Sequence, residues 1–471
     1  MGLRSVALAA SALVCAALAG TAGAQPLVPA MYAPFVGATP SAADVARLHR
    51  AGVQVLRLIL PWDQVAPGTR AAGFDAANPA DPGYAWSKID AAVTSAVKNG
   101  FEPILDVTGA PAWGAEAPAT TDSKGFALGP VNPDANALAQ FAVAAATRYG
   151  GDLAGLPRVR YWQLYNEPNF VSDLRPQVVH GQPISPELYR RMVNLFAAAV
   201  HGVHADNLVV AGGLTPFTFS TAQQRLSIAP LRFMRELLCM SAGAHPHPTC
   251  SGSVAFDVWA HHPYTSGGPT HKATELDDVS LGNLPAMKRL LDAAYAAGEI
   301  DSRSRPQFWV TEFSWDSNPP DPKAVPLALL DRWVPQAMYQ MWRNGVSLVT
   351  WFSLRDQAFP SAIQAGLYYR DGKPKPYLRG FRFPFVAFPR AKGVYVWGRT
   401  PTGRKATVTL QQRTAGRWRR VATVQTDASG IFRRTLKLPR TGHLRALVKG
   451  DRSLPFGLAA VPDRGYDPFG S

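Results

Sequence analysis

Two glutamates stand at the ends of apolar stretches that are typical of buried strands. Glu167 follows the stretch 159–165 and directly precedes Pro168, and Glu312 follows the apolar residues 308–310. A charged group at the end of a buried strand is costly unless a site uses it. Proline ends the ladder of strand hydrogen bonds and is expected to hold the preceding Glu167 in an extended backbone conformation. The alternative for Glu167 is a surface loop residue beside a turn.

The separation of these two carboxylates in the sequence restricts the folds that could bring them together. A parallel barrel gathers the C-terminal ends of its strands around one mouth, so residues far apart in the chain can meet there. Two carboxylates that flank one bond are the groups that hydrolysis of a glycosidic bond requires. The pair therefore predicts a barrel whose mouth cleaves sugars.

Alternation of apolar stretches with helical patterns extends along most of the chain, which is typical of a (β/α)8 barrel. Seven helices are expected: 41–49, 84–99, 134–149, one that begins with a Ser185 cap and Pro186, 231–240, 284–297 and 325–342. Eight strands are expected: 31–38, 53–60, 103–107, 159–165, 207–212, 255–262, 308–313 and 346–352. This count places Glu167 after the fourth strand and Glu312 at the end of the seventh.

The motif Asn166-Glu167-Pro168, followed later by Thr311-Glu312, resembles the (β/α)8 glycoside hydrolases of clan A, such as families 5 and 39. The resemblance covers about residues 30–385. It implies a retaining mechanism in which Glu167 is the acid/base and Glu312 is the nucleophile. The two carboxyl groups of a retaining enzyme lie about 5–5.5 Å apart. No metal and no organic cofactor is expected.

The resemblance also implies roles for two polar residues near the glutamates. Arg57 lies inside an apolar strand, where a buried arginine needs a carboxylate partner, and the family's arginine at this place pairs with the nucleophile, here Glu312. The alternative is a structural ion pair with Asp106 or Asp63. Asn166 matches the asparagine that binds the 2-hydroxyl of the sugar, a contact that strengthens in the transition state.

Aromatic residues and histidines at other strand ends complete the predicted substrate site. His262 and Tyr264 match the family's His-x-Tyr, in which the histidine binds substrate and the tyrosine orients the nucleophile. His261 points the opposite way along the strand and is interpreted as a core residue. Trp351 matches the tryptophan that forms the floor of the sugar subsite, since an indole offers a flat apolar surface. Packing and further subsites are both open interpretations for Trp62, Trp113 and Trp315.

The N-terminus is typical of a secretory signal. Residues 1–24 combine Arg4, a short apolar core and a small-residue cleavage site, and no later stretch is long and apolar enough to span a membrane. We therefore expect a secreted, extracellular protein without membrane association. Cys239 and Cys250 remain after cleavage and predict a disulfide, with free thiols or a metal site as the alternatives.

Beyond residue 387 the sequence changes to short alternating stretches separated by turns. This pattern predicts that the catalytic domain 25–387 is followed by a small immunoglobulin-like β-sandwich, 388–471. The tail has 17 Lys and Arg against 4 Asp and Glu, whereas residues 25–387 have 30 against 29. Such a basic domain could contact acidic polysaccharide or the cell wall, or it could be a solvated face without a ligand. Export makes nucleic acid the least expected partner.

Two other functions are compatible with a barrel. A noncatalytic protein could bind carbohydrate or the cell surface through its basic tail, although binding alone does not need a matched acid and nucleophile. A metal-dependent hydrolase would need a ligand cluster at the strand ends, and the sequence offers no convincing one. The best-supported interpretation is a secreted retaining glycosidase acting on β-linked oligo- or polysaccharides.

Overall fold

A computed structural model describes residues 25–33, 40–153, 155–220, 226–360 and 363–466. The secretory signal predicted for residues 1–24 lies outside the described residues, as do residues 34–38 of the first predicted strand. Within the described ranges, no helix has the length and apolar character needed to cross a membrane.

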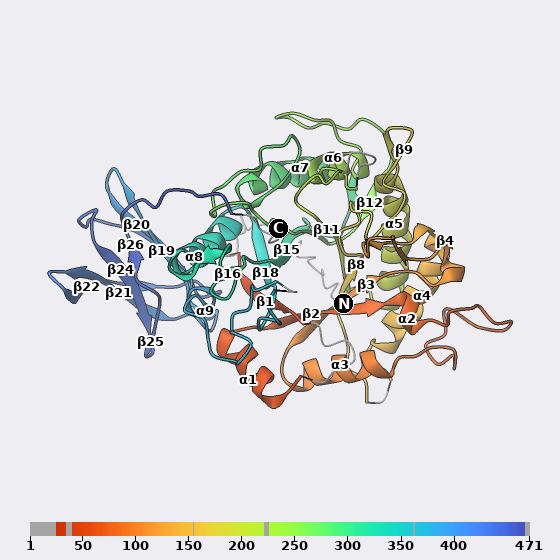
Figure 1. The fold of residues 1–471 in the computed structure, drawn as a ribbon, viewed down its shortest axis with the longest axis horizontal. Coiled ribbons are helices and arrows are strands. Elements are labelled where there is room, and N and C mark those ends of the chain that lie inside the picture. Colours follow the sequence, from red (N-terminus) through yellow and green to blue (C-terminus); the bar gives the residue numbers. More distant parts are fainter. Residues whose placement is uncertain (1–24, 34–39, 154, 221–225, 361–362, 467–471) are drawn as a thin grey trace, which may run out of the picture.

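Eight parallel strands close into a barrel at the centre of the molecule (Figure 1). Each strand pairs with its sequence neighbour in the barrel, and the first closes against the last through Met31 and Trp351. The predicted eight-stranded parallel barrel is therefore confirmed. Its strands are β1 (Val28–Tyr32), β2 (Val55–Pro61), β3 (Glu102–Thr108), β8 (Tyr161–Leu164), β11 (Leu208–Leu214), β13 (Val258–His261), β15 (Gln307–Phe313) and β18 (Val346–Trp351).

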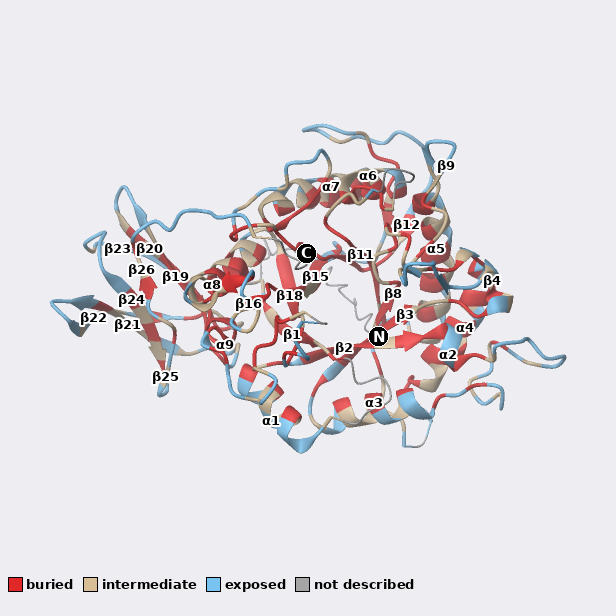
Figure 2. Cartoon of the chain, viewed as in Figure 1, coloured by how far each residue is buried: buried red, intermediate tan, exposed pale blue. Residues whose placement is uncertain are grey.

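Helices cover the outside of the barrel and bury their apolar faces against it (Figure 2). They are α1 (Ala42–Ala51), α2 (Trp62–Val65), α3 (Ser87–Lys98), α4 (Ala135–Arg148), α5 (Ser185–Val203), α6 (Pro230–Leu237), α7 (Leu284–Ala297), α8 (Leu327–Arg343) and α9 (Leu378–Arg382). Short strand pairs lie in the connections: β4 (Ala115–Ala117) with β7 (Val131–Pro133), β5 (Thr120–Thr121) with β6 (Ala127–Leu128), β9 (Val178–Val179) with β10 (Gln182–Pro183), β12 (Val254–Ala255) with β14 (Ile300–Asp301), and β16 (Ser317–Asn318) with β17 (Val325–Pro326).

The predicted helix ends agree with the structure to within three residues, but one predicted cap is wrong. The Ser41 hydroxyl accepts the Asp44 N–H as the N-cap of α1, and α7 ends at Gly298 in the left-handed conformation that glycine favours. Ser185, however, is the first residue of α5 and not its cap. Its hydroxyl donates to the buried side chain of Gln177 at 2.8 Å, so it serves the core and not the helix end.

The first barrel strand begins earlier than the sequence pattern predicts. β1 covers Val28–Tyr32, and the prediction began at Met31. Val28 pairs with Leu348 on one side and Tyr32 pairs with Arg57 on the other, so the two neighbouring strands fix the register. Strand pairing of this kind is not visible in local composition.

The chain after the barrel forms a β-rich domain of two antiparallel sheets. One sheet has the order β19-β20-β23, and the other has the order β22-β21-β24-β25, with β26 also pairing with β24. The domain begins at Phe385, shortly before the predicted boundary, because β19 pairs along its length with β20. Its strands are β19 (Phe385–Arg390), β20 (Gly393–Arg399), β21 (Thr407–Thr414), β22 (Arg417–Gln425), β23 (Ile431–Leu436), β24 (His443–Val448), β25 (Asp451–Arg452) and β26 (Phe456–Gly457).

A disulfide joins Cys239 to Cys250, as the sequence predicted. The bond closes the loop that follows α6. Because both sulfur atoms are in the disulfide, neither free thiols nor a metal site is present at these two cysteines. The crosslink stabilises this loop mainly by restricting the unfolded chain.

Candidate active site

The backbone turns sharply where the fourth barrel strand, β8, delivers Glu167. Tyr165 and Glu167 have φ values of 62° and 37°, in the left-handed region that residues with a side chain rarely adopt. The expectation that Pro168 would hold Glu167 extended is therefore wrong. The Glu167 N–H donates instead to the Gly213 carbonyl of β11 at 3.0 Å. Strained backbone of this kind persists where the surrounding structure enforces it, often at functional sites.

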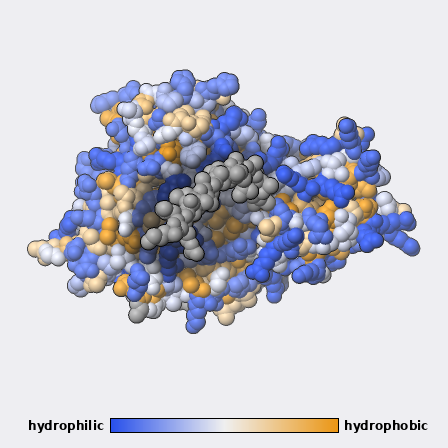
Figure 3. Space-filling model, turned by 180° about the vertical axis from the view of Figure 1, so that it is seen from behind, coloured by the Kyte–Doolittle hydropathy of each residue, from blue (hydrophilic) through white to orange (hydrophobic). Residues whose placement is uncertain are grey.

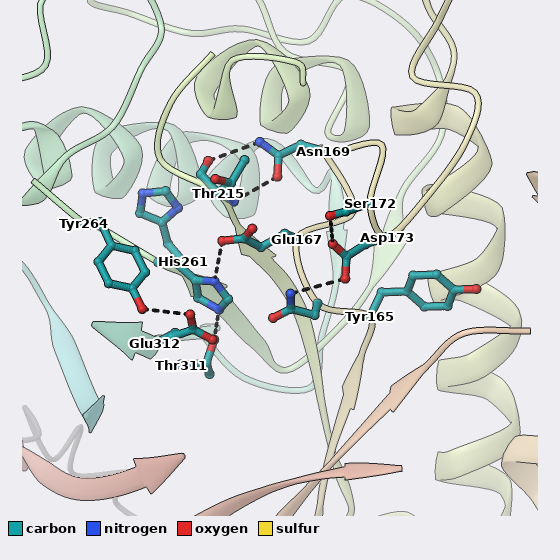
Figure 4. A network of polar contacts seen from close by, with 12 residues as sticks. Tyr165, Glu167, Asn169, Ser172, Asp173, Thr215, His261, Tyr264, Thr311 and Glu312 are labelled. Atoms are coloured by element: carbon teal, nitrogen blue, oxygen red, sulfur yellow. Dashed lines mark hydrogen bonds and ion pairs between the residues drawn. The ribbon is translucent and has the colours of Figure 1, made fainter. Parts of the chain in front are cut away.

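Two donors hold Glu312 at the end of the seventh barrel strand, β15. Arg57 Nη1 donates to Oε2 at 2.9 Å. The Tyr264 hydroxyl donates to Oε1 at 2.8 Å, as Figure 4 shows. Both contacts agree with the sequence interpretation of Arg57 and Tyr264. Two donors on the two carboxylate oxygens fix the orientation of the Glu312 side chain.

Arg57 is buried and joins three polar residues of the site. Besides Glu312, its Nη2 donates to Asp106 Oδ2 at 2.5 Å and to Asn166 Oδ1 at 2.7 Å. The predicted ion pair with the nucleophile candidate and the alternative pair with Asp106 are thus both present. Among the described residues, Asp63 is not an ion-pair partner of Arg57.

His262 connects the two strands that carry the glutamates. Its Nδ1 lies 3.0 Å from Glu167 Oε1, and its Nε2 lies 3.1 Å from Thr311 Oγ1. Burial lowers the pKa of His262 to about 3, so the imidazole is neutral at pH 7. His261 points to the other side of the strand, where its Nε2 meets the Val279 carbonyl at 2.7 Å in the core, as the sequence predicted.

Burial and the neighbouring Glu312 raise the pKa of Glu167 to about 8. The Arg57 charge opposes this shift and does not overcome it. Glu167 consequently keeps its proton at neutral pH, although its side chain is still 17% exposed. A carboxyl group that is protonated at neutral pH can act as a general acid.

Asp173 is a second carboxyl group that holds a proton at neutral pH, and no sequence pattern pointed to it. It accepts hydrogen bonds from Asn166 Nδ2 at 3.2 Å and from the Ser172 hydroxyl at 2.6 Å (Figure 4). Burial, together with the charge of Glu167, raises the pKa of Asp173 to about 8. Asp173 lies in the connection that follows β8. Polar and apolar residues alternate irregularly there, so no periodic pattern distinguishes a buried acid from an exposed one. Asp106, by contrast, could be suspected as a charge inside an apolar strand.

Trp351 lies at the end of β18 but is only 1% exposed. Its indole N–H donates to the Ala365 carbonyl at 2.8 Å, and its ring packs among Phe313, Tyr377 and Phe381. The structure places Trp351 near the end of the barrel, and its predicted role as a sugar floor stays a prediction.

The three other strand-end tryptophans are mainly packing residues. Trp62 and Trp315 are fully buried, and Trp62 stacks on Phe141 of α4. Trp113 is half-buried and lies beneath the guanidinium of Arg70, 5.2 Å from its ring centre. Of the further subsites considered from the sequence, only the one at Trp113 retains a partly accessible ring.

Comparison with known proteins connects the fold to glycosidases. No protein-family model and no curated protein sequence matches this chain. A family 39 glycoside hydrolase from the gut symbiont Bacteroides cellulosilyticus WH2 has a TM-score of 0.50 at 15% identity, covering 88% of this chain and 81% of that one. A GH30 endoxylanase from Clostridium papyrosolvens C71 has a TM-score of 0.47 at 13% identity, with coverages of 88% and 94%.

The likeness to the family 39 structure concerns the fold, because only 15% of the residues are identical. It agrees with the barrel fold that the resemblance of the two glutamate motifs implied. What this chain does must be argued from its own side chains, since one barrel fold carries many functions.

Proposed function

We propose that this protein is a retaining glycoside hydrolase that cleaves β-linked oligo- or polysaccharides. Glu167 is the general acid and base, and Glu312 is the nucleophile. Arg57 and Tyr264 orient Glu312, while Asn166 and His262 position the substrate and the acid. Trp351 forms part of the floor of the sugar subsite.

The observation that carries this proposal is the unequal environment of the two glutamates. Glu167 is buried beside a like charge and holds a proton, whereas Glu312 receives hydrogen bonds from an arginine and a tyrosine. Retaining hydrolysis needs one carboxyl group that donates a proton and one that attacks as an anion. Different environments for two carboxyl groups assign these two roles.

In the first step, Glu167 gives its proton to the glycosidic oxygen while a Glu312 oxygen bonds to the anomeric carbon and the leaving sugar departs. The glycosyl-enzyme has an ester at position 312, so the charge that raised the pKa of Glu167 is gone. Glu167, now a carboxylate, takes a proton from water, and the water oxygen attacks the anomeric carbon and releases Glu312. Two inversions retain the anomeric configuration.

Asn166 has one N–H available for this reaction. Its carbonyl oxygen accepts from Arg57, and one amide hydrogen is directed to Asp173, so the second hydrogen of the NH2 group can bind a sugar hydroxyl. Because both ends of the amide are fixed, its orientation is set before the substrate arrives, and no rotation is needed on binding. His262, neutral and held by Thr311, fixes the position of the Glu167 carboxyl group in the same way.

The export and domain predictions belong to the same proposal. Residues 1–24 direct secretion, residues 25–387 form the catalytic unit, and the two antiparallel sheets form an immunoglobulin-like accessory domain. The disulfide supports an oxidising location, since such bonds persist outside the cytosol.

The proposal is tested by sugar release from a panel of β-linked aryl glycosides and polysaccharides. We expect residues 25–471 to release sugar, and Glu312→Ala to lower kcat by roughly 10⁴-fold, the scale seen when a nucleophile is removed. The product anomer, followed by ¹H NMR in the first minutes, should have the β configuration. Glu187→Ala, an exposed glutamate on α5, is the matched control and should leave the rate unchanged.

Three results would contradict the proposal. Equal activity of Glu312→Ala and the parent chain would mean that Glu312 is not the nucleophile. An initial α product would replace the retaining mechanism by an inverting one. Absence of sugar release on every substrate, together with binding of a polysaccharide, would favour a noncatalytic binding protein.

A further inference from the structure

The outer face of the larger C-terminal sheet gathers cations from four strands. Strand pairing places Gln411 between Arg420 and Arg445, and pairs Arg413 with Trp418. Residues directly opposite each other on neighbouring strands project from the same face of a sheet. Arg452 joins this face through its pairing with Leu447. We call this surface the arginine face: Arg413, Trp418, Arg420, Arg445 and Arg452.

The opposite face of this sheet is buried, so the arginine face points away from the domain core. Val408 and Leu410 of β21 and Leu444 and Ala446 of β24 alternate with the face residues and belong to the hydrophobic core. Arg413, Arg420 and Arg452 are exposed to solvent. In the reverse view of Figure 3, the C-terminal domain lies at the right and carries many strongly hydrophilic side chains.

The cations of this domain have no carboxylate partners. Among the described residues from 388 to 466, no lysine or arginine forms an ion pair, whereas many barrel arginines do. The domain's own described acids are turned elsewhere. Asp451 pairs with Arg382, Asp463 pairs with His271, and Asp427 accepts backbone N–H groups in its own turn. Among the described residues, the positive charge of this domain is therefore not compensated by ion pairs.

Trp418 and Arg445 give this face a fixed geometry as well as charge. The Arg445 guanidinium lies 4.2 Å from the centre of the Trp418 ring, although β22 and β24 are separated by β21. The indole therefore extends along the sheet and does not stand away from it. Arg445 Nε also donates to Gln411 Oε1 at 2.8 Å, and among the described residues its two terminal NH2 groups have no hydrogen-bond acceptor. A guanidinium held in place by stacking and a hydrogen bond is pre-organised to bind a carboxylate with two parallel hydrogen bonds.

We propose that the arginine face binds a polysaccharide that bears carboxylate groups and thereby anchors the protein to that polysaccharide, either free or on a cell surface. A long chain with charges at each sugar matches a flat face with several cations spread over four strands. The half-buried indole supplies an apolar surface to the C–H face of a sugar ring. This inference does not depend on the catalytic proposal, since the face lies on a separate domain.

The test measures retention of the full chain, residues 25–471, on immobilised polygalacturonate in 0.15 M salt, beside a neutral galactan matrix and a polyacrylate matrix. We expect retention on polygalacturonate and none on galactan. Changing Arg413, Arg420 and Arg452 together to glutamine should weaken the apparent affinity by at least 10-fold. Trp418→Ala should weaken binding to polygalacturonate by several-fold and leave polyacrylate retention unchanged.

The control variant removes the same charge from elsewhere on the domain. Arg434, Lys437 and Arg440 are exposed on β23 and the following loop, on the other sheet. Their triple change to glutamine should alter the affinity less than 2-fold. Equal loss in both triple variants would overturn the proposal, because binding would then follow net charge. So would stronger retention on double-stranded DNA than on polygalacturonate, or no retention at all. All changed arginines and the lysine are exposed, so melting temperatures should stay within about 2 °C of the parent.

Discussion

Replacing Glu167 by glutamine should make the protein more stable at neutral pH while removing its proposed acid. In the unfolded chain this carboxyl group titrates near 4.5, and in the folded protein burial and Glu312 raise its pKa to about 8. Between these two values the folded state holds a proton that the unfolded state has lost. The free energy of unfolding therefore falls as the pH rises through this window. Glutamine does not titrate, so the variant escapes this loss.

The expected change in the free energy of unfolding follows from the pKa shift of Glu167. Each unit of pKa corresponds to about 1.4 kcal/mol, so a shift of between three and four units amounts to about 5 kcal/mol in the limit of full desolvation. The Glu167 side chain is still 17% exposed, and water there reduces the penalty. We therefore expect about half, ~2–3 kcal/mol, by pH 8. For a chain of this size that corresponds to roughly 3 °C in Tm.

Thermal unfolding of the parent and Glu167→Gln at half-unit steps from pH 4.5 to 9 measures this difference directly. The Tm of the variant should match that of the parent near pH 5 and exceed it progressively up to pH 8, with little further change above. Glu187→Gln serves as the control, since this glutamate is exposed on α5 and its Tm difference should not vary with pH. The alkaline limb of the parent's kcat/KM should fall in the same range.

A Tm difference that stays constant from pH 5 to 8 would refute the reasoning. It would mean that Glu167 is already ionised in the folded protein at neutral pH, and the acid role would lose its support. If the Tm of Glu167→Gln instead fell below that of the parent as the pH rises, the fold would be stabilising the Glu167 carboxylate. That would be the opposite of the buried, protonated environment inferred for this side chain.

Three further outcomes are expected. Tyr264→Phe removes the hydroxyl that donates to Glu312, and should lower kcat by about 10²-fold with little change in KM, as measured on an aryl glycoside; an unchanged kcat would deny the tyrosine a role. The charge of Glu167 raises the pKa of Asp173, and the repulsion between two ionised carboxyl groups is mutual, so Asp173→Asn should move the alkaline limb of the pH–rate profile to lower pH by about half a unit; a limb that stays in place would show that the two groups do not interact. Reducing the disulfide of the 239–250 loop should cost about 3 kcal/mol and lower the Tm, while the rate at 25 °C is kept; a lost rate would tie this loop to the site.

Periodic features of the sequence were sufficient to predict the barrel. Alternating strand and helix patterns and two glutamates at strand ends predicted eight parallel strands with Glu167 after the fourth and Glu312 on the seventh. Such features are local, because apolar periodicity and capping residues report on the backbone of one segment. Arg57 could be selected in the same way, since a charge within an apolar strand is a local anomaly that demands a partner.

Features that depend on long-range pairing could not be predicted in this way. The starting point of β1 is decided by its two neighbours, and Ser185 serves Gln177 in preference to its own helix. The left-handed turn at Glu167 overrides the preference that Pro168 imposes, because Gly213 of the next strand holds the backbone there. Local preferences of a few kcal/mol yield where tertiary contacts fix the chain.

The sequence by itself determined which residues could do chemistry and the type of fold that would gather them. Only the tertiary structure decided how protons and charges are distributed among them. Arg57 contacts two carboxylates at once, those of Glu312 and Asp106, whereas the sequence interpretation treated these two partners as alternatives. Asp173 became part of the site only through its burial near Glu167, and the arginine face only through strand register. Protonation and charge complementarity depend on distance and on exclusion of water, and both are properties of the folded chain.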